Sequence, residues 1–246
     1  MNDEDVIKIE HFSKRFGKFV VLDNINLSVK KGEILGLLGP SGSGKTTLIK
    51  AIVGMCEPTQ GLISVLGTKM PSLSVISKIG YMAQSDALYE DLNALDNILF
   101  FSSLYGLKGK LAKKRANEIL ELVLLHNEGK KLIKNFSGGM KRRLSLAIAL
   151  VHNPEILILD EPTVGIDPLL RIEFWKEFDR LRKEGVTIII TTHVMDEAEH
   201  CDRLALIRNG GIIAIGTPEE LKKTSGESTV EGAFLYYGKE REVKNI

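Results

Sequence analysis

The chain has 246 residues, of which 43% are hydrophobic and 26% charged, and its formal net charge is +1. The length suits one large domain or a domain with an inserted lobe, and the composition is that of a soluble globular protein. The balanced charge argues against nucleic acid or an anionic membrane surface as a partner, and no apolar run reaches the ~20 residues of a membrane-spanning helix. The two cysteines, Cys56 and Cys201, match no metal-binding spacing and indicate a reducing compartment.

The N-terminal part of the chain carries strand patterns. Residues 1–5 are acidic and contain no apolar stretch, so we expect no secretory signal. Apolar and polar residues alternate over 6–9 and 20–29, which predicts two strands. Short apolar stretches at 61–67 and 79–82 predict two further strands.

A glycine-rich loop of the pattern G-x-x-x-x-G-K-[ST] lies between a predicted buried strand at 33–38 and a predicted helix at 47–53. Glycine lacks a Cβ, so backbone N–H groups can turn toward phosphate oxygens, and the helix N-terminus adds a positive partial charge. Lys45 can reach the β- and γ-phosphates, and the Thr46 hydroxyl can ligate Mg²⁺. The alternative is a chance match, but the strand–loop–helix context favours a phosphate-binding loop made of Gly39, Pro40, Ser41, Gly42, Ser43, Gly44, Lys45, Thr46 and Thr47.

The pattern becomes helical from about 92 to 125 and returns to alternating strands and helices after Pro154. An apolar stripe at helical spacing in the first of these regions is interpreted as core-facing. The later region predicts strands at 156–159, 186–191, 203–208 and 212–215, and helices at 166–183 and 195–201. The chain therefore reads as an α/β core with a helical subdomain inserted at about 86–152, and residues 231–246 form a weakly structured tail.

Two carboxylates follow the predicted buried strand at 156–159. Asp160 can hold Mg²⁺, directly or through water, together with Thr46. Glu161 points in a different direction by strand alternation and can polarise water for attack on the γ-phosphate. The alternative is that Glu161 caps the turn before Pro162, but the phosphate loop in the same chain favours the catalytic role.

The segment at 136–143, Phe-Ser-Gly-Gly-Met-Lys-Arg-Arg, has the features of an anion-binding helix start. Ser137 is a good N-cap, and Gly138 and Gly139 expose N–H groups ahead of an apolar helix. With the phosphate loop and the two carboxylates, this segment resembles the Leu-Ser-Gly-Gly-Gln signature of ATP-binding subunits of ATP-binding-cassette (ABC) transporters. The resemblance covers about 7–221. It implies a P-loop NTPase (RecA-like) core with an N-terminal antiparallel β subdomain and an inserted α-helical subdomain, the ABC ATPase domain spanning 1–230.

The resemblance also implies roles for single residues. Gln84 matches the glutamine that senses Mg²⁺ and links the core to the helical lobe, so Thr46, Gln84 and Asp160 would form the metal site. His193 matches the histidine near the γ-phosphate, and would be catalytic together with Gln84 and Glu161. Taken alone, Gln84 could be a surface amide and His193 a structural residue.

Three further roles follow from the same resemblance. Ser137, Gly138 and Gly139 would bind the nucleotide held by a partner subunit. Asp167 would lie in the loop that crosses the dimer interface, although it could also cap the helix that begins at Pro168. The adenine-stacking aromatic corresponds to Phe16, with Phe12 and Phe19 as neighbouring alternatives.

Met140 stands where the signature usually has glutamine, so the polar contact of that glutamine is absent. This variant, together with 97–106, resembles a prokaryotic branch that serves drug, lipid or polysaccharide exporters. Residues 131–135 lack the acidic segment found before the signature when the ATPase is fused to membrane helices.

We therefore expect a subunit that binds and hydrolyses ATP with Mg²⁺ and powers transport, with export as the direction, through a separate membrane permease. It would lie on the cytoplasmic face of the cell membrane and pair with a second ATPase subunit as a homodimer or heterodimer, without nucleic acid. The alternative is a soluble ABC ATPase that acts on ribosomes or DNA. Such proteins usually carry two ATPase cores or long coiled-coil insertions, and the net charge of +1 also disfavours a polyanion partner.

Overall fold

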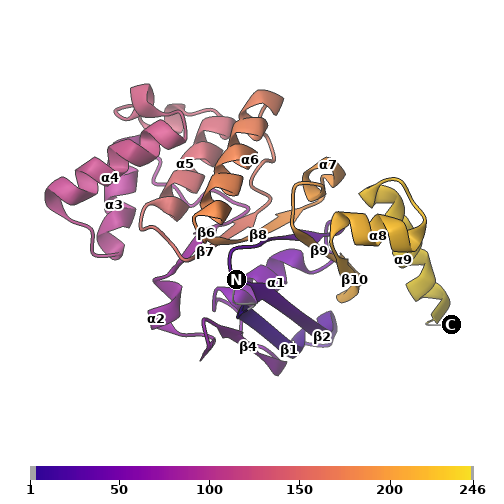
Figure 1. Cartoon of the computed structure of the whole chain (residues 1–246). Helices are drawn as coiled ribbons and strands as arrows, with labels where there is room; N and C mark the ends of the chain where they lie inside the picture. Colours follow the sequence, from indigo (N-terminus) through magenta and orange to yellow (C-terminus); the bar gives the residue numbers. More distant parts are fainter. Residues whose placement is uncertain (1–3, 245–246) are drawn as a thin grey trace. The chain divides into compact units, whose positions relative to one another are not determined.

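A computed structural model describes the backbone of residues 4–244 and the side chains of 4–239 (Figure 1). The contacts divide the chain into two compact units, which we call unit 1 (1–76 and 182–246) and unit 2 (77–181). Each unit contains part of the predicted chemistry, and each is described by itself below.

Unit 1 contains an antiparallel sheet with the strand order β2-β1-β4-β5 (Figure 1). The predicted N-terminal antiparallel β subdomain is thus confirmed. Strand β2 exceeds the predicted 20–29 by one residue at each end, whereas β1 is much longer than the predicted 6–9. Bulges interrupt their register, and His11 and Asn24 have φ angles of 49° and 48°, so the two-residue period breaks inside each strand. The strands are β1 (Asp5–Phe16), β2 (Phe19–Lys30), β4 (Gln60–Val65) and β5 (Thr68–Lys69).

A second group of strands in unit 1 has the order β10-β9-β3-β8. Strand β3 (Ile34–Leu38) lies between the parallel strands β8 (Thr187–Thr192) and β9 (Arg203–Arg208), and all five of its residues are buried, as is typical of a strand in a parallel sheet covered on both faces. The outer strand β10 (Gly211–Gly216) pairs antiparallel with β9. Helices α1 (Lys45–Ile52) and α7 (Met195–Ala198) follow β3 and β8, and α2 (Leu73–Ile76) is a single short turn.

The C-terminal segment is helical, which corrects the prediction of a weakly structured tail at 231–246. Helix α8 (Pro218–Ser225) begins with a capping box in which Thr217 and Glu220 bond each other's backbone N–H, and α9 (Val230–Lys244) contacts it. Val230 and Phe234 of α9 are buried at helical spacing. The tail therefore becomes ordered through tertiary packing that its weak local pattern did not reveal; 245–246 lie outside the described residues.

Unit 2 contains the parallel pair β6 (Ile79–Met82) and β7 (Ile156–Asp160) and a group of helices (Figure 1). Three helices that lie within the predicted insertion contact one another: α3 (Ala94–Leu104), α4 (Gly109–Leu122) and α5 (Gly138–Leu150). Short 3₁₀ turns occur at His126–Glu128 and Ile133–Asn135, and α6 (Pro168–Lys183) follows β7. Across residues 4–244, no helix combines the length and the apolar character that crossing a membrane requires.

Candidate active site

The phosphate loop of unit 1 connects β3 to α1. Gly42 and Gly44 have φ angles of 79° and 105°, a region that side chains with a Cβ rarely adopt. At Gly39 and Gly44 an added Cβ would also collide with neighbours, the Ile207 carbonyl oxygen at 2.2 Å and the Leu22 side chain at 2.6 Å. The backbone of the loop is therefore fixed in a curled form that only glycine permits at these positions.

Two side chains of this loop are arranged to receive an anion. Lys45 is buried, and its Nζ donates to the carbonyl oxygens of Gly39 at 2.7 Å and Pro40 at 3.1 Å, so the ammonium group lies inside the curl of the loop. The Ser43 Oγ is buried and has no hydrogen-bond partner within the part of the chain that the structure describes. A buried hydroxyl of this kind and a positive charge at a helix N-terminus fit a phosphate group.

His193 follows β8 directly, and the last residues of β8 and β3, Thr192 and Leu38, are register partners. His193 and Gly39 therefore leave the same edge of the sheet, and the role of His193 near the γ-phosphate stays a prediction. The buried side chain of Glu197 accepts a hydrogen bond from the Thr192 hydroxyl at 2.8 Å, and that hydroxyl accepts one from the N–H of Val194 at 2.9 Å. These contacts hold the backbone on both sides of the exposed His193.

The aromatic residues near the end of β1 separate into buried and exposed ones. Phe12 is fully buried in the core, which excludes it as an adenine platform. Phe16 and Phe19 are register partners at the end of the β1–β2 hairpin, and they are 57% and 71% exposed. Lys14 Nζ lies 5.1 Å from the centroid of the Phe16 ring. Both exposed rings can stack on a base, and Phe16 stays the predicted one.

In unit 2, two of the three predicted catalytic residues, Gln84 and Glu161, lie with Asp160 at the carboxyl ends of β6 and β7. Met82 and Leu159 are register partners, and Gln84 and Asp160 follow them. Gln84 Nε2 donates to Glu161 Oε2 at 3.2 Å, so these two of the predicted catalytic side chains are in contact. Asp160 is buried, whereas Gln84 is exposed.

Glu161 has a φ angle of 51°, a left-handed conformation that is uncommon for a residue other than glycine. Such a conformation turns the chain sharply after β7 and sets the direction of the carboxylate. The charge of Asp160 also reaches β6: burial, and secondarily this charge, raise the pKa of Tyr81 to about 12.

A further residue at this location, Arg142, was not predicted from the sequence. Its guanidinium is buried and donates to carbonyl oxygens on both strand ends, and it lies 3.6 Å from an Asp86 carboxylate oxygen. Burial lowers the pKa of Arg142, and the charges of Asp86 and Asp160 oppose that shift. No motif signals this role; the one available indication was an arginine on the apolar face of the helix that follows the signature.

The signature segment lies at the start of α5. Ser137 caps the helix and accepts a hydrogen bond from the N–H of Met140 at 3.2 Å. Apart from its chain neighbours and the backbone of its own helix, a Cβ added at Gly138 would meet no described atom within 4 Å, and one at Gly139 would lie 3.6 Å from the carbonyl oxygen of Gly165. The signature is thus open to a ligand and adjoins the loop that contains Asp167.

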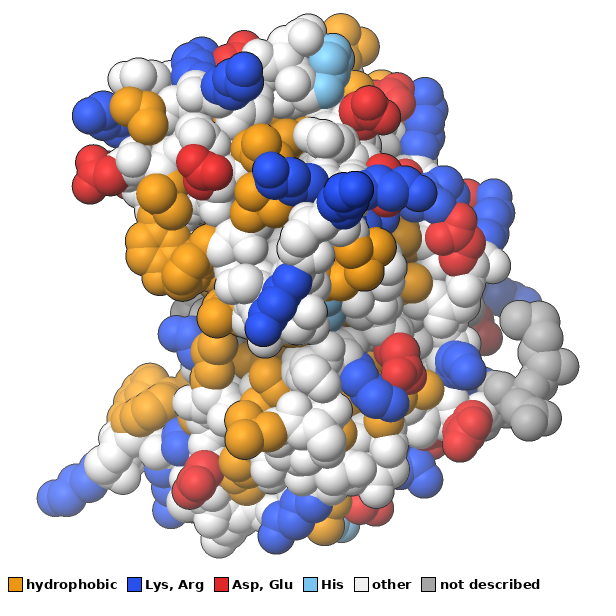
Figure 2. All heavy atoms as spheres, turned by 90° about the vertical axis from the view of Figure 1, so that its left-hand side faces the viewer, with side chains coloured by type: hydrophobic (Ala, Val, Ile, Leu, Met, Phe, Trp, Pro, Cys, Tyr) orange, Lys and Arg blue, Asp and Glu red, His pale blue; other side chains and the backbone are white. Residues whose placement is uncertain are grey.

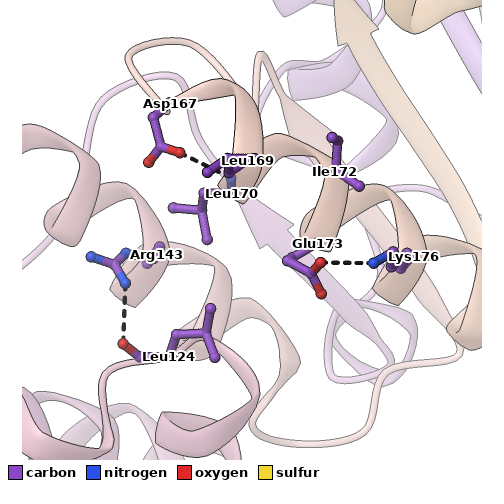
Figure 3. Close-up of a pocket in the computed structure, with 8 residues that line it drawn as sticks. All are labelled: Leu124, Arg143, Asp167, Leu169, Leu170, Ile172, Glu173 and Lys176. Carbon is purple, nitrogen blue, oxygen red and sulfur yellow. Dashed lines mark hydrogen bonds and ion pairs between the residues drawn. The ribbon is translucent and has the colours of Figure 1, made fainter.

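Asp167 caps α6, because its Oδ1 accepts a hydrogen bond from the N–H of Leu170 at 3.0 Å. The helix-cap role given as the alternative for Asp167 is confirmed. Beside this cap an open pocket of about 530 Å³ lies between α5 and α6 (Figure 3). Its wall joins exposed apolar side chains to charged ones and consists of Leu124, Arg143, Asp167, Leu169, Leu170, Ile172, Glu173 and Lys176.

Comparison with known proteins agrees with this arrangement of motifs. The model of the ABC transporter family matches residues 22–164. The probable multidrug ABC transporter ATP-binding protein YbhF of Escherichia coli (strain K12) is 43% identical over 239 residues, which are 94% of this chain and 41% of that protein. The chain thus spans about two fifths of the length of this relative.

Two further proteins are similar over most of their own length. The Nod factor export ATP-binding protein I of Burkholderia orbicola (strain AU 1054) is 42% identical over 87% of this chain and 72% of its own. A dimeric ATP-binding cassette in a post-hydrolysis state with bound ADP and Pi superposes with a TM-score of 0.79 at 28% identity, over 86% of this chain and 98% of its own. The predicted resemblance and the predicted P-loop NTPase fold are confirmed, and the chain belongs to the ABC transporter family.

Proposed function

We propose that this chain binds ATP and Mg²⁺, hydrolyses the ATP, and powers export through a separate membrane permease. The observation that carries the proposal is the phosphate loop, whose left-handed glycines and buried Lys45 form a cradle for an anion. Membership of the ABC transporter family makes the phosphates of ATP the expected occupant.

The predicted metal ligands are chemically suited to Mg²⁺. Thr46 offers a hydroxyl oxygen, Asp160 a carboxylate and Gln84 an amide oxygen, and Mg²⁺ prefers oxygen ligands. When bound, the metal ion neutralises charge on the β- and γ-phosphate oxygens. Lys45 and the N–H groups of the loop would hold the same phosphates in one orientation.

Glu161 is the proposed general base. Its carboxylate accepts a hydrogen bond from Gln84, which fixes its direction, and accepting a proton from water would prepare the attack on the γ-phosphate. His193, at the carboxyl edge of the sheet in unit 1, would contact the γ-phosphate.

Replacing Glu161 with glutamine tests this assignment. We expect ATP binding to persist and turnover to fall on the order of 10²- to 10⁴-fold, the usual effect of losing a general base. Glu155→Gln is the matched control, because Glu155 precedes the opposite end of β7 in an exposed ion pair with Lys78. Near-normal phosphate release by Glu161→Gln would remove Glu161 from the mechanism.

A second ATPase subunit would complete the site. The signature presents Gly138 with no described atom within 4 Å of its missing Cβ, and apolar side chains around the pocket next to Asp167 are exposed. Ser137, Gly138 and Gly139 would bind the partner's nucleotide, and this face would pack against the partner. The superposable cassette with ADP and Pi is itself dimeric.

Mixing two inactive variants tests the shared site. Ser137→Arg leaves the phosphate loop intact, and Lys45→Ala leaves the signature intact. In a mixed dimer one site carries both defects and the other carries none, so partial ATPase activity should return. Mixed dimers without any activity would contradict sites shared between two copies, and the absence of any homodimer would indicate a different ATPase subunit as partner.

The permease would dock on an aromatic cluster of unit 2. Tyr89, Phe100 and Phe101 have ring centroids 4.8 to 5.9 Å apart, and Tyr89 and Phe100 are 49% and 39% exposed. Figure 2 shows the side of the molecule that lies at the left of Figure 1, where α3 and α4 are labelled, and hydrophobic side chains gather on this surface. Export is the proposed direction because relatives have names that refer to multidrug transport and Nod factor export. The proposed location is the cytoplasmic face of the membrane, where the chain would be held by the permease.

Cell fractionation distinguishes this proposal from an ATPase that acts on ribosomes or DNA. The chain should sediment with membranes, and substitution of Phe100 with aspartate should release it while its ATP affinity stays unchanged. Sedimentation with ribosomes or nucleic acid, abolished by nuclease, would refute the transport function.

A further inference from the structure

We propose that Arg142 is a positioning residue for ATP hydrolysis, which couples the signature helix to Glu161 and Gln84 of the same chain. The inference rests on the proposed catalytic roles of those two residues. It goes beyond them by naming the group that holds them and the helix through which a partner's nucleotide would act.

The guanidinium of Arg142 joins two strand ends by four hydrogen bonds. Nη1 donates to the carbonyl oxygens of Ala83 at 2.7 Å and Gln84 at 3.1 Å, and Nη2 donates to those of Asp160 at 2.5 Å and Glu161 at 2.6 Å. A guanidinium carries four N–H bonds on its two terminal nitrogens. One buried side chain therefore uses both terminal nitrogens to hold the backbone of both catalytic residues.

The hydrogen bond from Arg142 to the Glu161 carbonyl oxygen helps to hold Glu161 in its left-handed backbone conformation. Glu161 has a φ angle of 51°, and such a conformation persists only where the surroundings hold it. Arg142 fixes the carbonyl oxygens on both sides of the Glu161 N–Cα bond, those of Asp160 and Glu161. Without these bonds the peptide could relax, and the Glu161 carboxylate would turn away from its contact with Gln84.

The same arginine belongs to the helix that begins at the signature. Ser137 caps α5, and Arg142 lies five residues after it, little more than one helical turn. Asp86 and Ser145 brace this connection, because Asp86 Oδ1 lies 3.6 Å from Arg142 Nη1 and accepts a hydrogen bond from the Ser145 hydroxyl at 2.7 Å. A nucleotide that moves the start of α5 would thus shift the carbonyls that orient Glu161 and Gln84.

Lysine cannot reproduce this arrangement. Its ammonium group has three donors on one nitrogen, whereas the arginine fork places two nitrogens at two strand ends. Arg142→Lys keeps the charge and loses the planar fork, and Arg142→Gln loses both. A graded effect of these two variants is therefore expected from a positioning role.

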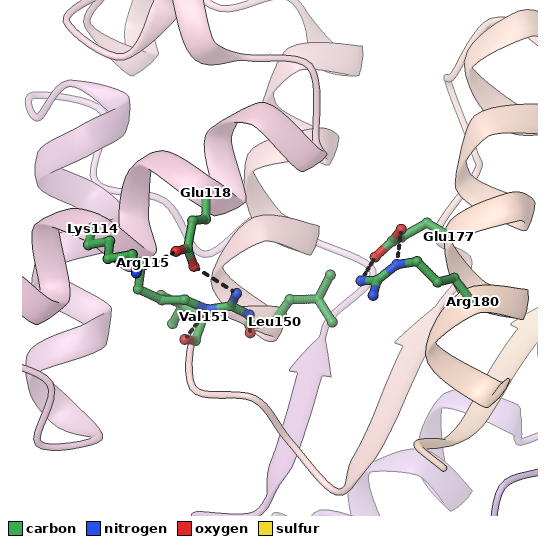
Figure 4. Close-up of polar contacts among 7 residues, drawn as sticks. All are labelled: Lys114, Arg115, Glu118, Leu150, Val151, Glu177 and Arg180. Carbon is green, nitrogen blue, oxygen red and sulfur yellow. Dashed lines mark hydrogen bonds and ion pairs between the residues drawn. The ribbon is translucent and has the colours of Figure 1, made fainter. Parts of the chain in front are cut away.

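Arg115 provides a matched control within the same helical group. It also anchors α5 through backbone carbonyls, donating from Nε to Val151 at 3.1 Å and from Nη2 to Leu150 at 3.0 Å (Figure 4). These contacts lie at the C-terminal end of α5, away from its signature end. Arg115→Gln loosens the helix without touching the carbonyls of Gln84 or Glu161.

The experiment measures ATP affinity and steady-state turnover of the full-length variants, with activities corrected for the folded fraction from a denaturation curve. We expect Arg142→Gln to lower kcat about 100-fold with an ATP Kd within about twofold of the original, because a misplaced catalytic group costs rate rather than binding. Arg142→Lys should lose about tenfold, and Arg115→Gln no more than about threefold. If Arg142→Gln fails to fold, Arg142→Lys carries the same comparison with Arg115→Gln.

A double-mutant cycle separates this inference from the function on which it rests. If Arg142 acts through Glu161, adding Arg142→Gln to Glu161→Gln should cost no more than about twofold further. The inference would be overturned if the losses in kcat of the two single variants multiply in the double variant. It would also be overturned if Arg142→Gln keeps turnover within about threefold of the original, or if Arg115→Gln loses as much kcat as Arg142→Gln. Normal turnover by Glu161→Gln alone would instead refute the proposed general base.

Discussion

Two glycines of the phosphate loop allow steric crowding to be separated from backbone strain. At Gly39 an added Cβ would lie 2.2 Å from the carbonyl oxygen of Ile207 and 2.9 Å from Ser43 Oγ. At Gly42 an added Cβ would meet no described atom within 4 Å, but φ is 79°. Gly39→Ala therefore tests close packing, and Gly42→Ala tests the left-handed backbone.

The expected magnitudes follow from these geometries. In Gly39→Ala the 2.2 Å separation must open to at least 3.0 Å, and the obstructing atom is backbone of β9, the strand paired with β3. Overpacking of this kind costs about 1–3 kcal/mol, and a backbone obstacle places the loss of unfolding free energy near the upper end. Gly42→Ala should lose about 1–2 kcal/mol, the cost of placing a Cβ in the left-handed region.

Urea denaturation and titration with a fluorescent ATP analogue provide the two measurements. Gly39→Ala should weaken ATP binding at least tenfold, because the start of the loop must move. Gly42→Ala should weaken it less, because no neighbour forces a displacement. A Gly39→Ala variant that is at least as stable as Gly42→Ala and binds ATP equally well would refute the assignment of the loop geometry.

Lys45→Ala should lower ATP affinity at least tenfold, because a hydrogen bond to a charged group contributes about 1.5–3 kcal/mol. Lys50→Ala, on the exposed side of α1, is the control and should leave the affinity unchanged. Equal affinities of the two variants in a titration would contradict the phosphate-loop assignment. Burial, and then the charges of Asp202 and Glu197, raise the pKa of the Cys201 thiol above its ordinary value of 9.0. Above about pH 9 the Cys201 thiol loses its proton in the unfolded chain but keeps it in the folded chain, so the free energy of unfolding should fall as the pH rises. Cys201→Ala should make the free energy of unfolding depend less on pH in this range. In native protein at pH 8 a thiol reagent should label Cys56 and spare Cys201, and rapid labelling of both would contradict the burial of Cys201.

Sequence could predict the parts of the fold whose information is local. The buried strand, the glycine loop and the helix start lie next to one another in the chain, and β6 and β7 are short apolar runs with clear ends. The capping box at Thr217 and Glu220 is equally local. Its Thr-x-x-Glu pattern could have predicted the start of α8, although no helix was predicted there. The full length of β1 was not available, because bulges break the alternation on which such predictions depend, whereas the predicted strand at 20–29 matches β2 to within one residue at each end.

Site residues follow the same division. Glu161 was predicted from its place after the buried strand and Gln84 from the family resemblance, and the structure adds their direct contact. Arg142 could not be identified from the sequence, because its four acceptors lie at the ends of two strands that are 18 to 59 residues away along the chain. Every residue has a backbone carbonyl, so the residue types in a sequence do not indicate which carbonyls accept hydrogen bonds. The partners of a side chain that binds backbone carbonyls therefore cannot be recognised from the sequence.

Met140 shows why the change in the signature is compatible with an intact site. The hydrogen bond that caps α5 runs from the Met140 backbone N–H to the Ser137 hydroxyl, so it does not depend on the side chain at 140. A Cβ added at Gly138 would not meet the Met140 side chain either, so the change at position 140 leaves the approach to Gly138 open. The substitution therefore removes one polar group and leaves the backbone that presents the other donors. Arg142, one turn further along the same helix, bonds the backbone carbonyls of the proposed catalytic residues Gln84 and Glu161, so the link we propose between the signature and these residues does not depend on the side chain at 140.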